Sequence, residues 1–274
     1  MNYKIHEVAK LLGITPQTLR FYEQYGILTS ERIGEGKYRQ YSNQSVDLLM
    51  SLRKCRNCGF TVAQTAELLK SEEPSQISAI LAEQGERLLR QAELERRIAL
   101  GMQETAQLTA SLAERLGRTE NRERPESYLI VLKRGDDERL SPKAMERIGT
   151  MTDWMPLIKW ARRVSLSGEP TEMGFLVRGD TAQFLGIADW PDAELLPVQP
   201  CVYALVRWPD GTAGAEACLR EMAAQLTEQG MELQGAPLVS TLWNLNAAAG
   251  GYAYGECWFP LKEAPHSDPL TVRV

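Results

Sequence analysis

Apolar residues at the start of the chain recur at helical spacing in two short segments. The first segment carries a stripe made of Ile5, Val8, Ala9 and Leu12. Gly13 then supplies the permissive backbone of a tight turn, and Thr15 caps a second helix whose first position suits Pro16. Leu19 and Tyr22 continue the apolar spacing in that second helix. Two short helices joined by a glycine-containing turn are typical of a DNA-reading helix-turn-helix.

A second apolar pattern follows Pro74 in a stretch rich in Ala, Leu, Glu, Gln and Arg that holds no further proline to about Gly117. Its apolar residues lie near heptad spacing at Ile77, Leu81, Leu88, Leu94, Ile98, Met102, Leu108, Leu112 and Leu116. The pattern predicts one long helix over residues 75–118. Because its apolar seam is narrow and its charges are mixed, we expect a partner helix to cover it. The alternative is that the helix packs against its own C-terminal domain.

Residues 119–126 are interpreted as a charged linker, and after them the pattern changes to strands and helices. The predicted strands are residues 128–133, 174–177, 183–188, 201–208, 238–243 and 252–261. The predicted helices are residues 142–164 and 214–230. The fold class is therefore α+β, with a helix-turn-helix head over residues 1–74, the long helix, and an α/β domain with an antiparallel sheet over residues 127–274.

Charge is distributed unevenly along the chain, whose net charge of -5 alone argues against a nucleic-acid binder. Residues 1–74 carry ten Lys and Arg against eight Asp and Glu, residues 75–124 carry eight of each, and residues 125–274 carry thirteen against twenty. The acidic balance thus lies in the C-terminal half and leaves a mildly basic head. Basic head residues that could meet phosphates are Lys10, Arg20, Arg32, Lys37, Arg39, Arg53, Lys54 and Arg56.

Composition also limits the cellular compartment and the chemistry. The chain holds no apolar run of membrane-spanning length and no signal-peptide core, so we expect a cytoplasmic protein without a membrane partner. Five cysteines at irregular spacing fit a reducing compartment. Cys55 and Cys58 form a close pair, but no second pair or nearby histidine completes a structural zinc site, so we expect no metal and no cofactor.

Enzyme chemistry is not expected either. The two histidines, His6 and His266, lie in the first helix and in the C-terminal tail, so neither is placed for nucleophilic catalysis. The glycine-containing segment 247–251 lacks the spacing of a phosphate-binding loop. No catalytic residue is assigned.

Three further segments complete a motif around the helix-turn-helix. Residues 15–23 are followed by Gly26, residues 38–41 read Tyr-Arg-Gln-Tyr, and residues 56–60 read Arg-Asn-Cys-Gly-Phe before another apolar helix. In content and order these segments resemble the MerR family of bacterial transcription regulators, although Cys55 stands where the family has leucine. The resemblance implies a winged helix-turn-helix and an antiparallel coiled coil that joins two subunits. It also implies a homodimer that binds double-stranded promoter DNA and acts on RNA polymerase.

The same resemblance places the helix of residues 15–23 in the DNA major groove. The residues expected to contact DNA are Thr15, Gln17, Thr18, Arg20, Tyr22, Tyr38, Arg39 and Tyr41. Arg20 and Arg39 are the strongest candidates, because an exposed arginine at those positions has little packing role. The alternative for each of these residues is structural support of the small head.

The order of elements from residue 201 to the closing segment Glu256-Cys257-Trp258-Phe259-Pro260-Leu261 resembles the GyrI-like effector-binding domain. That resemblance implies a repeated strand-helix-strand-strand unit, a curved antiparallel sheet over two helices, and a small molecule on the concave face. It also implies that Glu256 is a ligand-facing glutamate.

Alternation along the last predicted strand places Tyr252, Tyr254, Glu256 and Trp258 on one face. A carboxylate buried among rings without a partner would have a raised pKa, and an organic cation would restore its charge and gain cation-π contacts. The alternative is that Glu256 faces solvent or pairs with an arginine while the aromatic residues fill the core. The candidate effector-binding residues are Glu256, Tyr254, Trp258, Tyr128, Trp154, Tyr203 and Trp243.

The two family resemblances together imply ligand-responsive transcription control as the expected function. A dimer would activate transcription by distorting the promoter when a small hydrophobic, cationic molecule of the multidrug type binds the C-terminal domain. Such control requires that the ligand bind the two states of the dimer differently. The alternatives are a DNA-binding repressor without a ligand, and a GyrI-like hydrolase that uses Glu256 and is fused to a DNA-binding head.

Overall fold

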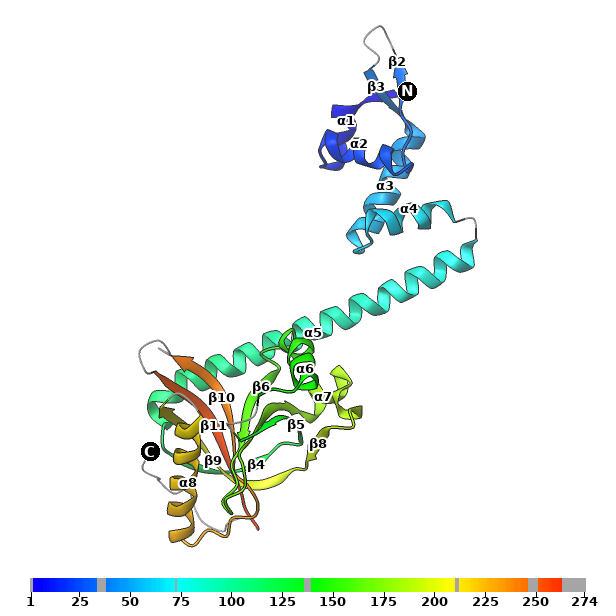
Figure 1. The fold of residues 1–274 in the computed structure, drawn as a ribbon. Helices are drawn as coiled ribbons and strands as arrows, with labels where there is room; N and C mark the ends of the chain where they lie inside the picture. The colour runs from blue at the N-terminus through cyan, green and yellow to red at the C-terminus, as the bar shows by residue number, and fades with distance from the viewer. Residues whose placement is uncertain are drawn as a thin grey trace. The chain divides into compact units, whose positions relative to one another are not determined.

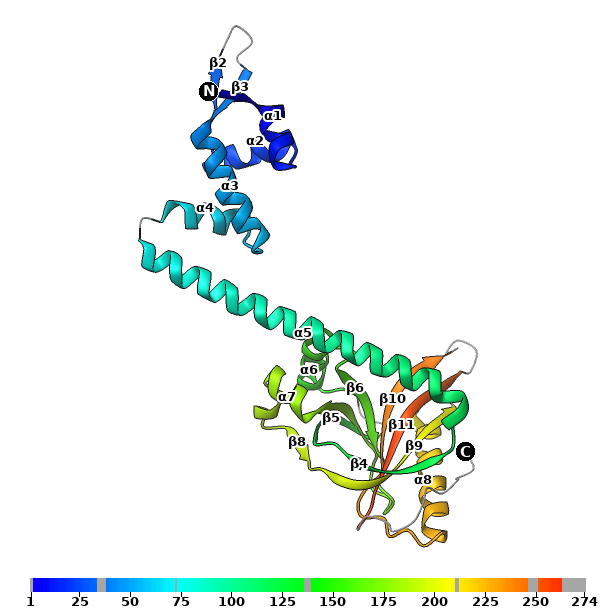
Figure 2. The same ribbon diagram turned by 180° about the vertical axis from the view of Figure 1, so that it is seen from behind.

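A computed structural model describes residues 2–33, 38–71, 73–135, 139–209, 212–245 and 251–262. The chain divides into two compact units, residues 1–94 and residues 95–274, drawn from opposite sides in Figures 1 and 2. Residues 34–37, 210–211 and 247–250 and His266, which entered the sequence analysis, lie outside the described residues. None of the described helices is long and apolar enough to cross a membrane.

Unit 1 contains the predicted helix-turn-helix and the two strands of a wing. Its elements are β1 (Asn2–Lys4), α1 (Ile5–Leu12), α2 (Pro16–Gln24), β2 (Glu31–Ile33), β3 (Tyr38–Ser42), α3 (Asn43–Asn57) and α4 (Val62–Lys70). The strands form an antiparallel sheet in the order β1-β3-β2. Helix α5 (Pro74–Arg115) begins in this unit and continues into the second.

The turn between α1 and α2 forms for the reasons that the sequence indicates. Gly13 ends α1 in the left-handed region at φ 61°, which glycine adopts without a steric penalty. The Thr15 hydroxyl accepts a hydrogen bond from the Thr18 N–H at 3.1 Å, and Pro16 occupies the first helical position. Val8 and Leu19 are then fully buried in the core that α1 and α2 share with α3.

The first turns of α5 belong to the packing of unit 1. Ile77 packs against a small cluster formed by Cys55, Phe60 and Leu68. The buried Gln84 side chain donates a hydrogen bond to the Cys58 carbonyl oxygen. The beginning of the long helix is therefore fixed to the head by both apolar and polar contacts.

Unit 2 is built on an eight-stranded antiparallel sheet in the order β4-β9-β11-β10-β6-β7-β5-β8. Its strands are β4 (Thr119–Arg124), β5 (Ser127–Arg134), β6 (Ile158–Arg163), β7 (Glu172–Arg178), β8 (Ala193–Leu196), β9 (Gln199–Pro209), β10 (Leu238–Leu245) and β11 (Tyr252–Pro260). Its helices after α5 are α6 (Pro142–Thr152), α7 (Gly179–Leu185), the 3₁₀ turn η1 (Ile187–Asp189) and α8 (Thr212–Glu228). The orders β5-α6-β6-β7 and β9-α8-β10-β11 are two copies of one strand-helix-strand-strand unit, as expected, and β6 pairs with β10 where they meet.

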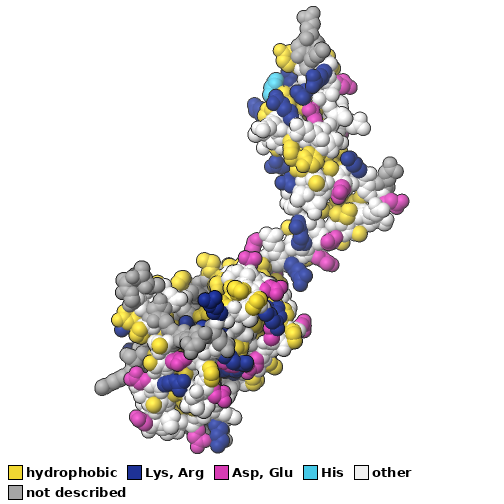
Figure 3. Space-filling model, viewed as in Figure 1, with side chains coloured by type: hydrophobic (Ala, Val, Ile, Leu, Met, Phe, Trp, Pro, Cys, Tyr) yellow, Lys and Arg dark blue, Asp and Glu magenta, His cyan; other side chains and the backbone are white. Residues whose placement is uncertain are grey.

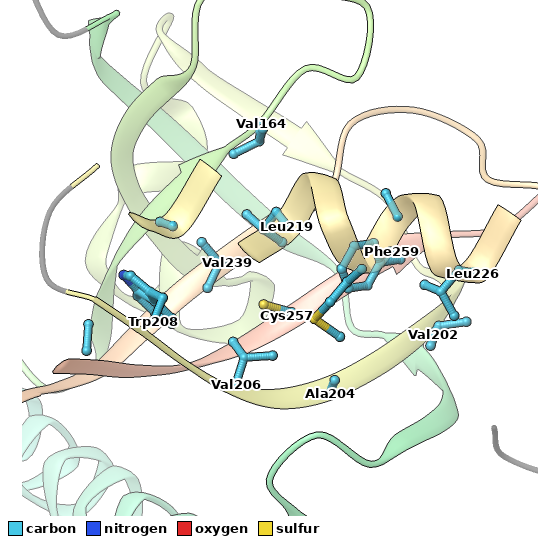
Figure 4. Close-up of a cluster of buried hydrophobic side chains, with 14 of the residues drawn as sticks. Val164, Val202, Ala204, Val206, Trp208, Leu219, Leu226, Val239, Cys257 and Phe259 are labelled. Atoms are coloured by element: carbon cyan, nitrogen blue, oxygen red, sulfur yellow. The ribbon is translucent and has the colours of Figure 1, made fainter. Parts of the chain in front are cut away.

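Helices α6, α7 and α8 cover one face of the sheet. Residues of α8 such as Leu219 and Leu226 pack on Val206, Cys257 and Phe259, as Figure 4 shows. Beneath α6 and α7 lies a second apolar cluster that includes Ile130, Phe175, Val177 and Met151. Cys257 and Phe259 thus face α8 while Glu256 and Trp258 face away from it, which confirms the predicted alternation of β11.

The C-terminal half of α5 packs on the opposite face of the sheet. Leu108 and Leu112 contact a cluster that includes Leu129, Tyr203, Leu205 and Trp258. The prediction of one long helix is confirmed. The apolar residues of its C-terminal part are packed, whereas those of its N-terminal part are exposed. Leu108 and Leu112 pack against the chain's own C-terminal unit, whereas Leu81 and Leu88 remain exposed on the part of α5 that belongs to unit 1.

Three sequence-based predictions of secondary structure are wrong. The supposed linker 119–126 contains strand β4, which pairs with β9 at the edge of the sheet. The predicted helix 142–164 ends at Thr152, and Ile158–Arg163 is strand β6. The predicted strand 183–188 is the end of α7 and the turn η1, because Gly186 at φ 72° ends the helix in the left-handed region.

Candidate functional site

The exposed side of α2 and its N-terminal cap carry four of the eight residues predicted to contact DNA. Thr15, Gln17 and Arg20 are exposed, and Thr18 is half-buried beside its capping partner. On the wing, Tyr38 is 72% exposed. Lys and Arg side chains gather on the face of unit 1 seen in Figure 3. This surface can present hydrogen-bond donors and positive charge to a nucleic acid backbone.

Three other predicted DNA contacts take part in the packing of unit 1, and two of them are bound by Glu23. The Arg39 Nε donates to Glu23 Oε2 at 3.0 Å, and the Tyr41 hydroxyl donates to Glu23 Oε1 at 3.0 Å. Tyr41 is completely buried, and Tyr22 is buried in the same core. The expectation that Arg39 is an exposed arginine without a packing role is therefore wrong, since it joins the wing to α2 through Glu23. Tyr22 and Tyr41 support the head rather than present their rings to a groove.

Protonation of Glu23 is expected to weaken unit 1. Burial raises the pKa of Glu23, but hydrogen bonds from Ser30, Tyr41 and Arg39 outweigh burial and leave the pKa below its ordinary value. A carboxyl group with a lowered folded-state pKa stabilises the fold above its unfolded pKa of about 4.3, and this stability is lost as pH falls through the folded-state pKa. Glu23→Gln is expected to destabilise unit 1 by about 1–2 kcal/mol near neutral pH and by much less near pH 3.

Hydrogen exchange measured by mass spectrometry on peptides from unit 1 tests this pH dependence without interference from unit 2. Glu67→Gln, at an exposed position of α4, removes the same charge without breaking the Glu23 contacts and serves as the control. Equal destabilisation by Glu23→Gln at both pH values would contradict the proposed role of the carboxylate charge.

Unit 2 contains a cavity of about 490 Å³ between the C-terminal half of α5 and the sheet. Leu100, Gly101, Thr105 and Leu108 of α5 form one wall, and residues of β4, β6, β7, β10 and β11 form the other. Glu256 and Trp258 reach the cavity from β11. The volume is in the range of small-molecule sites. The lining combines a small number of apolar side chains, such as Leu100, Leu108 and Trp258, with many charged and polar ones.

Glu256 is buried but has two partners. The Lys159 ammonium pairs with Glu256 Oε2, and the Tyr203 hydroxyl donates to Glu256 Oε1 at 3.1 Å. Burial, followed by the Glu256 charge and this hydrogen bond, raises the pKa of Tyr203. The argument for a cationic ligand assumed a carboxylate without a partner, and that premise is wrong because Lys159 on β6 already neutralises Glu256. The structure matches the alternative of a paired Glu256, with a lysine in place of an arginine.

The predicted aromatic residues are divided between the two faces of the sheet. Tyr203 is buried next to the cavity, with its ring 4.6 Å from that of Trp258. Tyr128 and Trp154 pack in the cluster beneath α6 and α7, away from the cavity. Trp243 is exposed, and its Nε1 donates to the Thr109 hydroxyl of α5 at 2.8 Å. Tyr254 is half-buried and is not part of the cavity lining.

Sequence reasoning missed most of the charged cavity wall. The basic lining residues are Arg96, Arg97, Arg122, Arg124, Lys159 and Arg178. The acidic lining residues are Glu104, Glu123, Asp180 and Glu256. Arg97 pairs with Asp180 at 3.4 Å, and the Arg122 guanidinium lies 4.5 Å from the centre of the Tyr203 ring. One signal in the sequence is the pair Arg122 and Arg124 within residues 119–126, the segment that the charge pattern assigns to a linker.

The cysteine pair of unit 1 has a packing role. Cys55 is buried against Phe60 and Leu68, and burial raises its pKa, which disfavours the thiolate that binds metals. Within the described ranges, no group of three or more His, Cys, Asp or Glu side chains is arranged to hold a metal ion.

Comparison with known proteins identifies the family of the head. The family described as MerR HTH family regulatory protein matches residues 3–72. Heavy metal-dependent transcription regulator 2 of Rhizobium meliloti (strain 1021) is 33% identical over 131 residues, which cover 46% of this chain and 82% of that protein. The chain belongs to the MerR family. Another MerR relative, the HTH-type transcriptional regulator CueR of Escherichia coli O157:H7, is 38% identical over 65 residues, and the chain spans about half (48%) of its length. Both relatives are transcription regulators, which argues against an enzyme.

Two solved structures share weaker similarity with the chain. One is the cryo-EM structure of the EcmrR-DNA complex in EcmrR-RPo, with 16% sequence identity and a TM-score of 0.38. The match covers 95% of this chain and 100% of the EcmrR chain. The other is the N-terminus of MtaN, the Bacillus subtilis multidrug transporter activator, with 22% sequence identity and a TM-score of 0.34. The match covers 38% of this chain and 97% of the MtaN chain. TM-scores below 0.5 do not establish a shared fold.

Proposed function

We propose that this MerR-family chain is a ligand-responsive transcription regulator. Unit 1 of a homodimer binds double-stranded promoter DNA, and a lipophilic small molecule in the cavity of unit 2 causes the dimer to distort the promoter for RNA polymerase. The observation that carries the ligand part of the proposal is the cavity of about 490 Å³ with Glu256 and Trp258 in its wall. The repeated strand-helix-strand-strand unit supports a GyrI-like effector-binding domain.

Two features support coupling between ligand and DNA within one chain. Helix α5 contributes Ile77 to the packing of unit 1 and forms a wall of the cavity in unit 2 with Leu108. A ligand that favours one arrangement of this wall would bias the dimer, provided that it binds the two states with different affinity.

A lipophilic cation would have to displace Lys159 from Glu256, so Glu256 alone does not select a cation.

In vitro transcription tests the proposal directly. The full chain first selects an operator from random DNA duplexes, and that operator is then placed between the promoter elements read by a bacterial RNA polymerase. We expect at least one lipophilic compound both to stabilise unit 2 against heat and to raise the yield of transcript. Compounds that bind without changing transcription would favour a repressor without ligand control, and chemical conversion of a bound compound would favour a hydrolase.

Arg20→Ala is expected to weaken DNA binding about tenfold, because the exposed guanidinium on α2 is placed to meet a base edge or a phosphate. Fluorescence anisotropy with the selected operator at several salt concentrations measures the loss. A phosphate contact would also lower the slope of log affinity against log salt by about one. Arg139→Ala, at an exposed position of unit 2, removes the same charge and should leave affinity unchanged. Equal effects of the two substitutions would contradict a DNA contact at Arg20.

A further inference from the structure

Arg124 carries a buried charge in the cavity wall. The residue is 5% exposed and lies at the end of β4. Its Nη2 donates to the Pro197 carbonyl oxygen at 3.2 Å and to Gln199 Oε1 at 3.5 Å, and both acceptors are uncharged. Its Nε has no hydrogen-bond partner among the residues that the structure describes. A guanidinium that is buried without a counter-charge is costly, so this site favours the arrival of an anion.

Two carboxylates near Arg124, those of Glu194 and Glu256, are bound by other cations. Glu194 acts on Arg124 through its charge, but both of its oxygens accept hydrogen bonds from Arg163, at 2.5 and 2.6 Å. Arg163 itself repels Arg124, and the largest effect, burial, also lowers the pKa of Arg124. On the cavity wall, Glu256 is held by Lys159 and Tyr203. Among the described residues, no carboxylate therefore forms a direct ion pair with the Arg124 guanidinium.

The balance of charge in the cavity is opposite to that of the unit around it. Six of the lining side chains are basic and four are acidic. Over residues 95–274, however, Lys and Arg number nineteen and Asp and Glu number twenty-five. Positive charge is thus concentrated where the chain leaves open space, and electrostatic attraction there favours an anionic ligand over a cationic one.

We infer that the cavity takes an organic anion, whose carboxylate pairs with Arg124 while its apolar body lies against Trp258, Leu108 and Leu176. Arg124 presents a planar fork that suits a carboxylate. The Lys159 ammonium has three N–H donors, so it can also donate to the ligand while it pairs with Glu256. This inference rests on the proposed function, because it names the ligand class of the same cavity.

A matched series of probes tests the charge preference on the unaltered full chain. Naphthaleneacetate, naphthaleneacetamide and naphthylethylammonium share one apolar body and differ in charge. In isothermal titration calorimetry at low salt, we expect naphthaleneacetate to bind at least about tenfold more tightly than naphthaleneacetamide and naphthylethylammonium to bind most weakly. Salt should weaken the binding of the acetate more than that of the amide.

Two substitutions assign the preference to the cavity. Arg124→Gln should reduce naphthaleneacetate affinity about tenfold and change naphthaleneacetamide affinity little. Lys159→Met should lower the affinity for naphthaleneacetate and raise the affinity for naphthylethylammonium, because the substitution leaves the Glu256 carboxylate without its cation. Arg139→Gln, at an exposed position outside the cavity, is the control with the same loss of charge. Tryptophan fluorescence and the melting temperature check that each variant remains folded.

The inference would be overturned if the unaltered chain bound naphthylethylammonium more tightly than naphthaleneacetate. The proposed function would then still hold, with a cationic ligand. Equal binding of all three probes, or an acetate affinity that is the same in Arg124→Gln, would also overturn the inference. Failure of the proposed function would show separately, as transcription that does not respond to compounds bound in the cavity.

Discussion

Gly174→Ala is expected to unfold or severely destabilise unit 2, by about 3 kcal/mol or more. Gly174 lies on β7 opposite Val131 of β5, beside an irregularity in the register between these strands. A Cβ atom at residue 174 would lie 1.9 Å from the Ile130 carbonyl oxygen and 3.1 Å from the Val131 Cα. These are backbone atoms, so no side-chain rotation can relieve the clash, and strands β5 and β7 must move apart.

Urea unfolding followed by tryptophan fluorescence measures this effect specifically, because all six tryptophans of the chain lie in unit 2. Gly149→Ala provides a matched control on the exposed side of α6, where a Cβ would meet nothing within 4 Å. That control should stabilise unit 2 by about 0.5–1 kcal/mol, since alanine is the better helix former. If the two variants unfolded at the same urea concentration, the close approach of β5 and β7 at Gly174 would be wrong.

Leu89→Glu is expected to separate the proposed homodimer, raising its dissociation constant about 100-fold, or about 3 kcal/mol. Leu89 lies on α5 within unit 1 and is 73% exposed in the single chain, and Leu81 and Leu88 are exposed nearby. A second copy of α5 would bury these side chains, and a glutamate at position 89, next to Leu88 of the apolar seam, would place a charge in that interface. DNA binding should fall with dimerisation, because a single head meets only one half of a palindromic operator.

Sedimentation velocity over a range of protein concentrations measures the oligomeric state, and anisotropy measures the affinity for the selected operator. Leu11→Glu is the control, because Leu11 lies on α1 and is 62% exposed but is not on the long helix. It should leave the dimer intact. A Leu89→Glu protein that remains dimeric at the same concentrations as the unaltered chain would contradict the proposed use of this part of α5.

Local signals account for what the sequence predicted correctly. The caps at Gly13 and Thr15 act within one turn of the chain, and the alternation of Glu256, Cys257 and Trp258 follows from strand geometry alone. The prediction of a helix over residues 142–164 failed because apolar spacing continues past the true end of α6, while Pro156 marked the break. Strand β4 was missed because its charged residues lie at a sheet edge, where half of the side chains meet solvent.

The chemistry of the cavity depends on contacts between distant residues, which spacing does not reveal. Lys159 and Glu256 are ninety-seven residues apart and meet only because β6 and β11 lie on either side of β10. The α5 wall of the cavity comes from a segment whose pattern indicated a partner helix. Sequence therefore identified the carboxylate but not the ammonium that neutralises it, and the omission changed the expected charge of the ligand.

The two strand-helix-strand-strand units contribute opposite members of one ion pair. Lys159 belongs to the first unit and Glu256 to the second, and each stands buried or half-buried beside the junction of β6 and β10. A protein made by duplicating either unit would bury two like charges, or one charge without its counter-ion, at this junction. Each unit therefore depends on the other for the counter-ion of its charge at this junction.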